Sequence, residues 1–166
     1  MIAIHHNKGS FSEKWIEYCE KNNLFYKLVD CFSSDLVDEL KTSKYLLWHW
    51  NHNDYKAQLC ARQIIYSVES MGIKVFPNSN TCWHFDDKIG QKYLLEALNA
   101  PLINSYVFYD KVSAQNWTSS VSFPKVFKLR SGAGSTNVKL IAFFSTFAVI
   151  LGSPAGSGFK INASHF

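Results

Sequence analysis

The last third of the sequence contains no acidic residue. Eleven Lys and Arg against thirteen Asp and Glu give residues 1–110 a net charge of −2, whereas six basic and no acidic residues give residues 111–166 a net charge of +6. A metal ion held by side-chain carboxylates of residues 111–166 is therefore excluded. An anionic ligand would be favoured there, but a total charge of +4 is too small to indicate a nucleic-acid partner.

Paired cysteines and long apolar runs are also missing. The four cysteines include no C-x-x-C pair, and no apolar run reaches the ~18 to 20 residues that span a bilayer. The first residues lack the basic flank and long apolar run of a secretory signal. We therefore predict a cytoplasmic protein with reduced thiols and no membrane span. The spacing of Cys60, Cys82 and His84 matches no zinc-site pattern.

The first 77 residues alternate short apolar runs with amphipathic ones, which is typical of βαβ units. Strands are expected at residues 1–5, 25–29, 45–49 and 74–76, with helical patterns between them. This order predicts an α/β fold with an open, Rossmann-like parallel sheet. Ligand-facing loops are expected at the carboxyl ends of its strands.

Residues 78–141 predict a small α+β lobe with antiparallel strands. Asp86 or Asp87 would open a helix, and Ala100-Pro101 would stop it. Strands are expected at residues 102–109, 124–129 and 138–141, with a polar helix or turn at 113–119.

Residues 123–140 read as a strand, a glycine loop and a second strand. Two glycines let the loop take positive φ and turn backbone N–H groups toward an anion, and hydroxyl side chains add donors. Lys128 and Arg130 precede the loop and add positive charge. The pattern is compatible with a phosphate-binding loop. Its predicted ligand-binding residues are Ser131, Gly132, Ala133, Gly134, Ser135 and Thr136.

Two better-known phosphate motifs are excluded, but one structural alternative remains. The sequence has no G-x-x-x-x-G-K-[ST], and Asn137 stands where the dinucleotide fingerprint has its third glycine. A Gly-Ser β-hairpin with solvated lysines fits the local sequence as well as a phosphate loop does.

Two segments together resemble the start of an ATP-grasp ligase. They are residues 76–95 (FPNSNTCWHFDDKIGQKYLL) and residues 125–138 (KVFKLRSGAGSTNV). The resemblance implies a pre-ATP-grasp domain at residues 1–77 and a first ATP-grasp lobe at residues 78–141. It also implies the family activity, in which ATP activates a carboxylate as an acyl phosphate for ligation to an amine or similar nucleophile.

The resemblance implies two lysines that hold ATP. In the family a lysine in an Asp-Lys helix start reaches the nucleotide phosphates, which points to Lys88. A second lysine lies on the strand before the glycine loop, which points to Lys128, and the loop would fold over the β- and γ-phosphates. Two ammonium groups and several N–H donors would offset polyphosphate charge. We expect Lys92, Lys125 and Arg130 to be ordinary solvated side chains.

The chain departs from the family after Leu140. Complete relatives supply a ribose-binding carboxylate and the Mg²⁺ ligands from a second grasp lobe, and this sequence has no counterpart of them. Residues 142–166 form a hydrophobic and Gly-Ser tail without a charge between Lys139 and Lys160. We expect a truncated or frameshifted ending and an isolated chain that is inactive. Alternatively, a genuine short ending packs on the second lobe or on a partner, including a second copy of the chain.

Polar residues follow the expected third strand. His49, His52 and Asp54 lie where the carboxyl end of that strand would face a ligand crevice, so they are candidate contacts for a small carboxylate substrate. Packing and a solvated loop explain them more simply. His5 and His6 occupy the same position after the first strand, where we also expect a structural role.

Other function classes stay open. The chain could be a non-catalytic nucleotide-binding module, or a protein-interaction module that uses its hydrophobic ending as a docking strand. A flavodoxin-like or receiver-like domain built on the first four strands is a further alternative, for which residues 5–10 supply only a weak phosphate loop.

Overall fold

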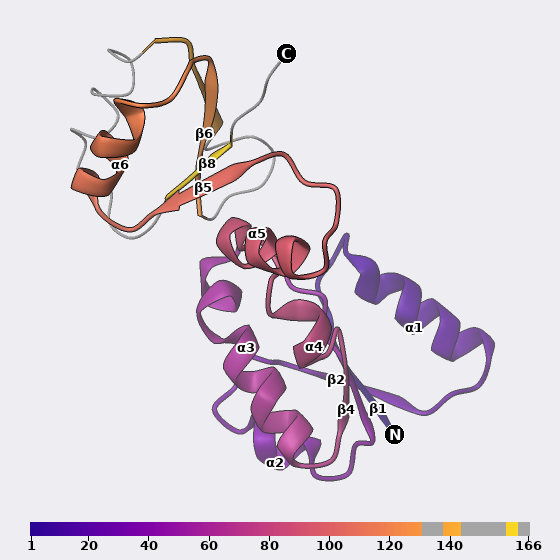
Figure 1. Cartoon of the computed structure of the whole chain (residues 1–166). Helices are drawn as coiled ribbons and strands as arrows, with labels where there is room; N and C mark the ends of the chain where they lie inside the picture. Colours follow the sequence, from indigo (N-terminus) through magenta and orange to yellow (C-terminus); the bar gives the residue numbers. More distant parts are fainter. Residues whose placement is uncertain (131–137, 144–158, 163–166) are drawn as a thin grey trace. The chain divides into compact units, whose positions relative to one another are not determined.

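The computed structural model describes residues 1–130, 138–143 and 159–162, the last four by their backbone alone. The chain divides into two compact units, Met1–Trp83 and His84–Phe166 (Figure 1). The first is built on a parallel sheet and the second on an antiparallel sheet, which confirms the predicted fold class. Identifying these units with a pre-ATP-grasp domain and a first ATP-grasp lobe stays a prediction.

Four parallel strands form the sheet of the first unit, in the order β2-β1-β3-β4. In this register Ile4 lies opposite Leu28 and Leu47, and Leu47 lies opposite Phe76. Because side chains alternate along a strand, these four residues share one face, and Ala3, His5, Leu46 and Val75 share the other. The strands are β1 (Ile2–His5), β2 (Tyr26–Val29), β3 (Tyr45–Leu47) and β4 (Lys74–Phe76).

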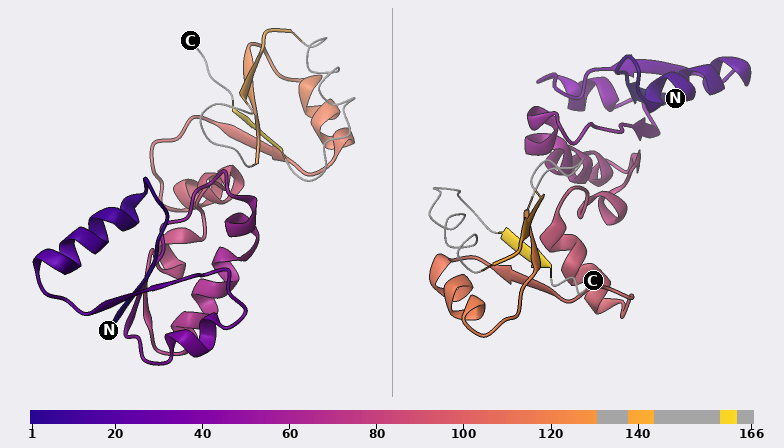
Figure 2. Two further views of the ribbon diagram at one scale, coloured as in Figure 1. Left: turned by 180° about the vertical axis from the view of Figure 1, so that it is seen from behind. Right: turned by 90° about the horizontal axis from the view of Figure 1, so that it is seen from above.

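Helices cover both faces of this sheet (Figures 1 and 2). Helix α1 (Phe11–Lys21) lies on the Phe76 face, where the Trp15 ring contacts the Phe76 ring at 6.3 Å between centroids. Helices α2 (Leu36–Leu40) and α3 (Tyr55–Ser70) lie on the other face. This second layer holds the main core, whose fully buried members include Leu40, Leu46, Trp48, Ala61, Ile65 and Val68.

A short helix α4 (Ser79–Cys82) follows β4 and was not predicted. Asn78 accepts a hydrogen bond from the Thr81 N–H, and the Thr81 hydroxyl accepts one from the Asn78 N–H. This reciprocal capping box satisfies backbone donors that a single helical turn would otherwise leave without partners.

Four antiparallel strands form the sheet of the second unit, in the order β5-β8-β6-β7. Helix α6 packs on the core side, where Phe108, Ala114, Phe127 and Ile141 are buried together. The elements are α5 (Lys88–Ala97), β5 (Ser105–Phe108), α6 (Lys111–Thr118), β6 (Lys125–Leu129), β7 (Val138–Ile141) and β8 (Phe159–Asn162).

Strand β8 was not predicted, and it comes from the hydrophobic ending. It pairs with β5 on one side and with β6 on the other. Residues 159–162 therefore belong to the sheet of the second unit, and the expectation of a truncated or frameshifted ending stays a prediction. Among the described residues, no helix combines the length and the apolar character needed to cross a bilayer.

Candidate nucleotide-binding site

The start of α5 is bound to the end of β6. The Asp87 carboxylate caps α5 by accepting hydrogen bonds from the Ile89 N–H at 3.1 Å and the Gly90 N–H at 3.0 Å. The Arg130 guanidinium donates to the same carboxylate from Nη2 at 2.5 Å and from Nε at 3.1 Å. The Lys88 N–H donates to the Arg130 carbonyl at 3.1 Å. Asp87 thus caps α5, and two kinds of contact with Arg130, one through its side chain and one through its carbonyl, hold the Asp-Lys helix start beside the end of β6.

The Asp87–Arg130 pair is charged at neutral pH. Burial on its own would raise the pKa of Asp87, but hydrogen bonds from Arg130 and from the helix N–H groups outweigh burial and lower it. The hydrogen bond to Asp87 in turn raises the pKa of Arg130. The Arg130 side chain is 54% exposed, as expected of a solvated residue, but it also holds the helix start through its pair with Asp87.

Lys88 lies beside a carboxylate that the sequence analysis considered only as a helix start. Its Nζ is 3.8 Å from Asp86 Oδ1, and the two side chains are only 16% and 9% exposed. Asp86 has a φ of 52°, a left-handed conformation that few non-glycine residues adopt. This turn places the Asp86 carboxylate and the Lys88 ammonium on the same side of the helix start.

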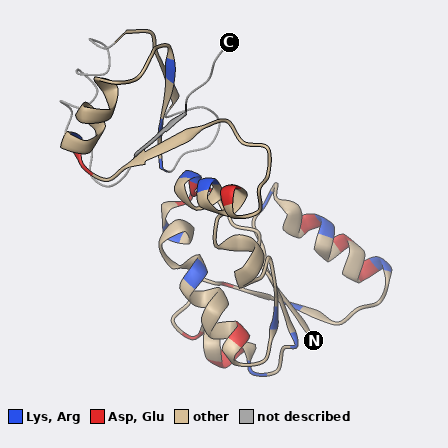
Figure 3. Cartoon of the chain, in the orientation of Figure 1, with Lys and Arg blue, Asp and Glu red and all other residues tan. Residues whose placement is uncertain are grey.

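Lys128 lies on β6 and Arg130 directly follows that strand. Phe127 occupies the opposite face, in the core. No ion pair of Lys128 is found among the described residues. Figure 3 shows the basic positions of β6 and the mixed charges of α5.

Lys88 and Lys128 are therefore brought to the same end of β6. Lys88 is bonded to Arg130 through the backbone, and Lys128 precedes Arg130 by two residues. The predicted glycine loop starts directly after Arg130. Its residues 131–137 lie outside the described residues, so the predicted roles of Ser131, Gly132, Ala133, Gly134, Ser135 and Thr136 stay predictions.

Two further lysines of this unit are buried, which the sequence analysis did not expect. Lys125 is 2% exposed and Lys92 is 8% exposed. Lys125 lies on the core face of β6 with Phe127 because two residues separate them. Lys92 pairs with Glu96 at 2.6 Å and lies over the Tyr93 ring at 4.4 Å. The expectation of solvated side chains is wrong here, since the aliphatic stem of a lysine packs well against apolar neighbours.

The three candidate substrate contacts of the first unit lie between β3 and α3 and have different surroundings. Asp54 caps α3 by accepting hydrogen bonds from the Lys56 N–H and the Ala57 N–H. His49 is exposed and contacts the Phe11 ring at 4.8 Å between centroids. His52 is half-buried. Capping explains why Asp54 is needed by the fold, and substrate contact by these residues stays a prediction.

Two buried donors lie at the same edge of the parallel sheet. His5 is 6% exposed, and its Nδ1 accepts a hydrogen bond from the Cys31 N–H at 2.9 Å. Burial lowers the pKa of His5 despite the opposing charge of Asp30. The imidazole is thus neutral with its proton on Nε2, because Nδ1 is the acceptor. Neither His5 Nε2 nor Trp48 Nε1 has a hydrogen-bond partner within the described ranges.

The sequence analysis did not consider His5 and Trp48 as neighbouring hydrogen-bond donors. The rings of His5 and Trp48 lie 5.4 Å apart between centroids. Alternation along β1 and β3 was the available signal, because it places His5 and Trp48 on the same sheet face. The residues that the structure describes contain no group of three or more His, Cys, Asp or Glu that could hold a metal ion.

No protein-family model matches the sequence, and no curated protein does. Solved structures of ATP-grasp enzymes and related synthetases do match its fold. A D-alanine–D-alanine ligase from Bacillus anthracis matches with a TM-score of 0.72 and 16% identity, over 99% of this chain and 56% of that one. An N5-carboxyaminoimidazole ribonucleotide synthetase from Thermus thermophilus matches with a TM-score of 0.76 and 12% identity, over 100% and 47% of the two chains.

A third match names the fold directly. A RimK domain protein ATP-grasp from Sphaerobacter thermophilus has a TM-score of 0.68 and 13% identity, over 99% of this chain and 64% of that one. The chain thus spans about half the length of the structures it matches. At these identities the likeness concerns the fold. The resemblance seen in the sequence is confirmed at that level: the chain has the fold of about half of an ATP-grasp enzyme.

Proposed function

We propose that this chain binds ATP through Lys88, Lys128 and residues 131–136, as part of a ligase that activates a carboxylate as an acyl phosphate. The observation that carries the proposal is the hydrogen bond from the Lys88 N–H to the Arg130 carbonyl. It supports the proposal because it holds Lys88 beside Arg130, the residue that follows β6 and precedes the predicted glycine loop. The fold match to ATP-grasp enzymes supports the same role.

The two lysines contribute differently to phosphate binding. Lys128 brings a positive charge on the face of β6 that points away from the core. Lys88 lies near Asp86 and exchanges part of that interaction for a phosphate oxygen when nucleotide binds. Lys128 is therefore expected to contribute the larger share of the affinity, because no carboxylate among the described residues pairs with it. ATP supplies the phosphoryl group when it is bound.

The substrate end of the proposal rests on the first unit. We place a small carboxylate at the carboxyl edge of its sheet, near His49, His52 and Asp54. The Nε2–H of His5 and the Nε1–H of Trp48 point to an acceptor at the same edge. Mg²⁺ would accompany the nucleotide phosphates, but no ligand for it is proposed from residues 111–166, which contain no carboxylate. We therefore propose that residues 1–166 by themselves bind ATP weakly and do not turn it over.

Calorimetric titration of the purified chain with ATP tests the proposal. Lys128→Ala should weaken binding about tenfold or more, which corresponds to about 1.4 kcal/mol. Lys139→Ala is a matched control. Lys139 lies on the neighbouring strand β7 and pairs with Phe127, so its side chain lies on the sheet face opposite to that of Lys128. This control should change the affinity less than about twofold.

Two results would overturn the proposal. Equal affinities for the wild type, Lys88→Ala and Lys128→Ala would remove the two lysines from the nucleotide site. Release of ADP by the wild-type chain, abolished in Lys128→Ala, would instead show that residues 1–166 turn ATP over.

A further inference from the structure

Helix α3 carries large apolar side chains on the side that points away from the core. Its buried residues are Ala57, Ala61, Ile65 and Val68. At about 3.6 residues per turn, Tyr55, Leu59 and Tyr66 lie on the opposite side of the helix. They are 74%, 74% and 55% exposed. These three residues are called the outer stripe of α3 below.

Charged residues are scarcer on α3 than on α1. Five of the 11 residues of α1 are charged, which is usual for a helix with one side in water, against three of the 16 residues of α3 (Figure 3). Two of these three are bonded to the α4 segment: Arg62 Nε donates to the Trp83 carbonyl at 3.1 Å, and the Ser79 N–H donates to Glu69 Oε1 at 3.0 Å. Lys56 is the remaining charge. A helix that is apolar on both sides is typical of burial on both sides.

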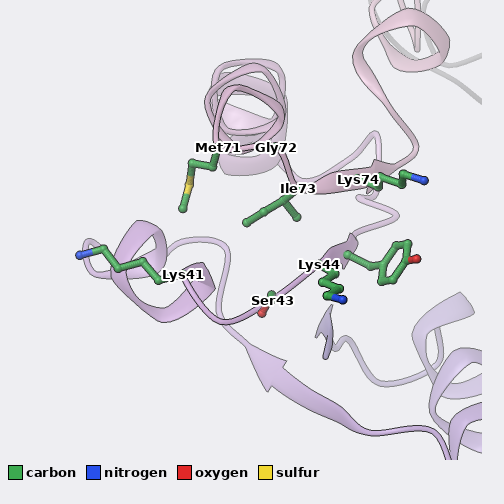
Figure 4. Close-up of a pocket in the computed structure, with 8 residues that line it drawn as sticks. Lys41, Ser43, Lys44, Met71, Gly72, Ile73 and Lys74 are labelled. Carbon is green, nitrogen blue, oxygen red and sulfur yellow. The ribbon is translucent and has the colours of Figure 1, made fainter.

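The pocket at the carboxyl end of α3 is separate from the outer stripe. Figure 4 shows Met71 and Ile73 extending from this end of the helix toward the segment that carries Ser43. None of the three stripe residues lines this pocket. The outer surface of a helix is convex, so the stripe suits packing against another helix better than binding a small molecule, which needs a concave site.

The spacing of the outer stripe is self-complementary. Steps of four and seven residues separate its members, as on the contact side of paired helices. At a rise of about 1.5 Å per residue, Tyr55 and Tyr66 lie about 8 Å on either side of the midpoint of the stripe, and Leu59 lies about 2 Å from it. If two α3 helices pack antiparallel about a two-fold axis through this midpoint, Tyr55 of each copy meets Tyr66 of the other. The two Leu59 side chains then meet beside the axis.

Area and charge are both compatible with a second copy of the chain as the partner. With about 200 Å² for a whole tyrosine side chain, the exposed fractions of Tyr55 and Tyr66 leave roughly 150 and 110 Å². These areas supply about a third of the ~800 Å² that each partner of a standard interface buries, before Leu59 and its polar neighbours are counted. Residues 1–83 contain nine Lys and Arg and nine Asp and Glu, so two first units do not repel each other through net charge.

We propose that this chain forms a homodimer in which the α3 helices of two copies pack antiparallel through the outer stripe. Tyr55 and Tyr66 contact each other at both ends of the helix pair, and Leu59 is buried at its centre. Because the interface is small, the dimer is weak, with a dissociation constant on the order of 100 μM. The stripe contains none of the predicted nucleotide or substrate residues, so the dimer does not depend on the proposed function.

Sedimentation velocity of the purified full chain without ATP, at concentrations above and below this dissociation constant, tests the dimer. The wild type should sediment faster as its concentration rises. Leu59→Glu should weaken association at least about tenfold, because it places two like charges beside the two-fold axis. Leu59→Gln serves as a second variant if Leu59→Glu does not fold, and it should weaken association at least about threefold.

A mixture of two variants tests the antiparallel arrangement. Leu59→Lys alone should also weaken association at least about tenfold. An equimolar mixture of Leu59→Glu and Leu59→Lys should associate at least about tenfold more tightly than either variant alone, because opposite charges then meet beside the axis. A mixture that associates no better than its two components would overturn the two-fold pairing of α3.

Tyr18→Glu is the matched control. Tyr18 lies on α1 of the same unit and is 62% exposed, so this variant adds the same charge at another exposed aromatic position. It should leave the dissociation constant within about twofold. Equal self-association of the wild type and Leu59→Glu would overturn the proposal and assign the contact to another surface, such as one formed by residues 142–166. A wild-type chain that stays monomeric at every concentration would overturn it as well.

Discussion

The two sheets of the chain are assembled from different ranges of sequence. In the first unit each strand is joined to the next by one helix, and the sheet is complete at Phe76. In the second unit β8 lies between β5 and β6, so Ser105 pairs with Asn162 and Leu129 pairs with Phe159. The first sheet therefore uses strands from within residues 2–76, including the β1–β3 pairing that skips β2, whereas the second depends on its most distant strand.

This difference bears on the two proposed sites. The proposed carboxylate site belongs to the sheet of the first unit. The proposed nucleotide lysines belong to the sheet whose strand β6 needs β8 as its neighbour on one side. We expect perturbations of β8 to reach nucleotide binding and to leave the first unit intact.

The largest expected effect comes from Ile161→Pro. Proline removes a backbone N–H from the strand that pairs with both Tyr106 and Phe127, and central strands do not tolerate it. We expect the second unit to lose about 3 kcal/mol or more of stability. Hydrogen exchange should show lost protection in β5 and β6 and unchanged protection in residues 1–83. Ile161→Val keeps the N–H and is the control, and equal exchange in both variants would contradict a central role for β8.

A medium effect is expected from Asp87→Ala, which removes the α5 cap together with the Arg130 pair. We expect the second unit to lose about 1–2 kcal/mol, measured by urea unfolding at neutral pH. Asp110→Ala removes the cap of α6, where the carboxylate accepts from the Ser113 N–H at 2.8 Å. No ion pair of Asp110 is found among the described residues, so the difference between the two losses reports the Arg130 contribution.

The Asp87 carboxylate makes the stability of the second unit depend on pH, and the direction of that dependence follows from its pKa. The folded pKa of Asp87 is lower than its ordinary value of 3.8, so its contribution is present above that pH. It is lost as the pH falls through the lowered folded pKa. An Asp87→Ala loss that stays constant from neutral pH down to strongly acidic pH would contradict the ionic pair.

The smallest effect is expected from His5→Asn in the first unit. Asparagine can keep an acceptor for the Cys31 N–H but does not titrate. Burial lowers the folded pKa of His5 below its ordinary value of 6.5, so wild-type stability should fall as the pH drops below 6.5 toward the folded pKa. The variant should lack this fall, which we expect to be about 1 kcal/mol or less. His6→Asn is the control, and the same flattening in that variant would assign the titration elsewhere.

The sequence predicted the first unit better than the second. Strands β1 to β4 were found because apolar runs alternated with helical patterns, and the boundaries differ by at most two residues. Helix α4 was missed because a single turn has no periodicity to detect, although Asn78 and Thr81 carried a capping signal. Strand β8 was missed because four residues in a low-charge tail gave no pattern that favoured pairing with β5 and β6.

The resemblance named Lys88 and Lys128 as phosphate-binding residues, and that role stays a prediction. Predictions that depended on the surroundings of a side chain were less accurate. The expectation that Lys92 and Lys125 are solvated was wrong. The position of a lysine along a helix or strand does not say how far its aliphatic stem is covered by neighbouring residues. The Arg130–Asp87 pair joins residues far apart in sequence, and no local pattern reports such a contact.

The position of β8 sets the timing of the second unit during synthesis. The first sheet can close soon after Phe76 leaves the ribosome, but the second must wait for the 33 residues from Arg130 to Asn162. At about 5–20 residues per second, that wait is about 2–7 s. Throughout it, β5 and β6 are present without the strand that separates them, and their open edges can pair with each other or with another nascent chain.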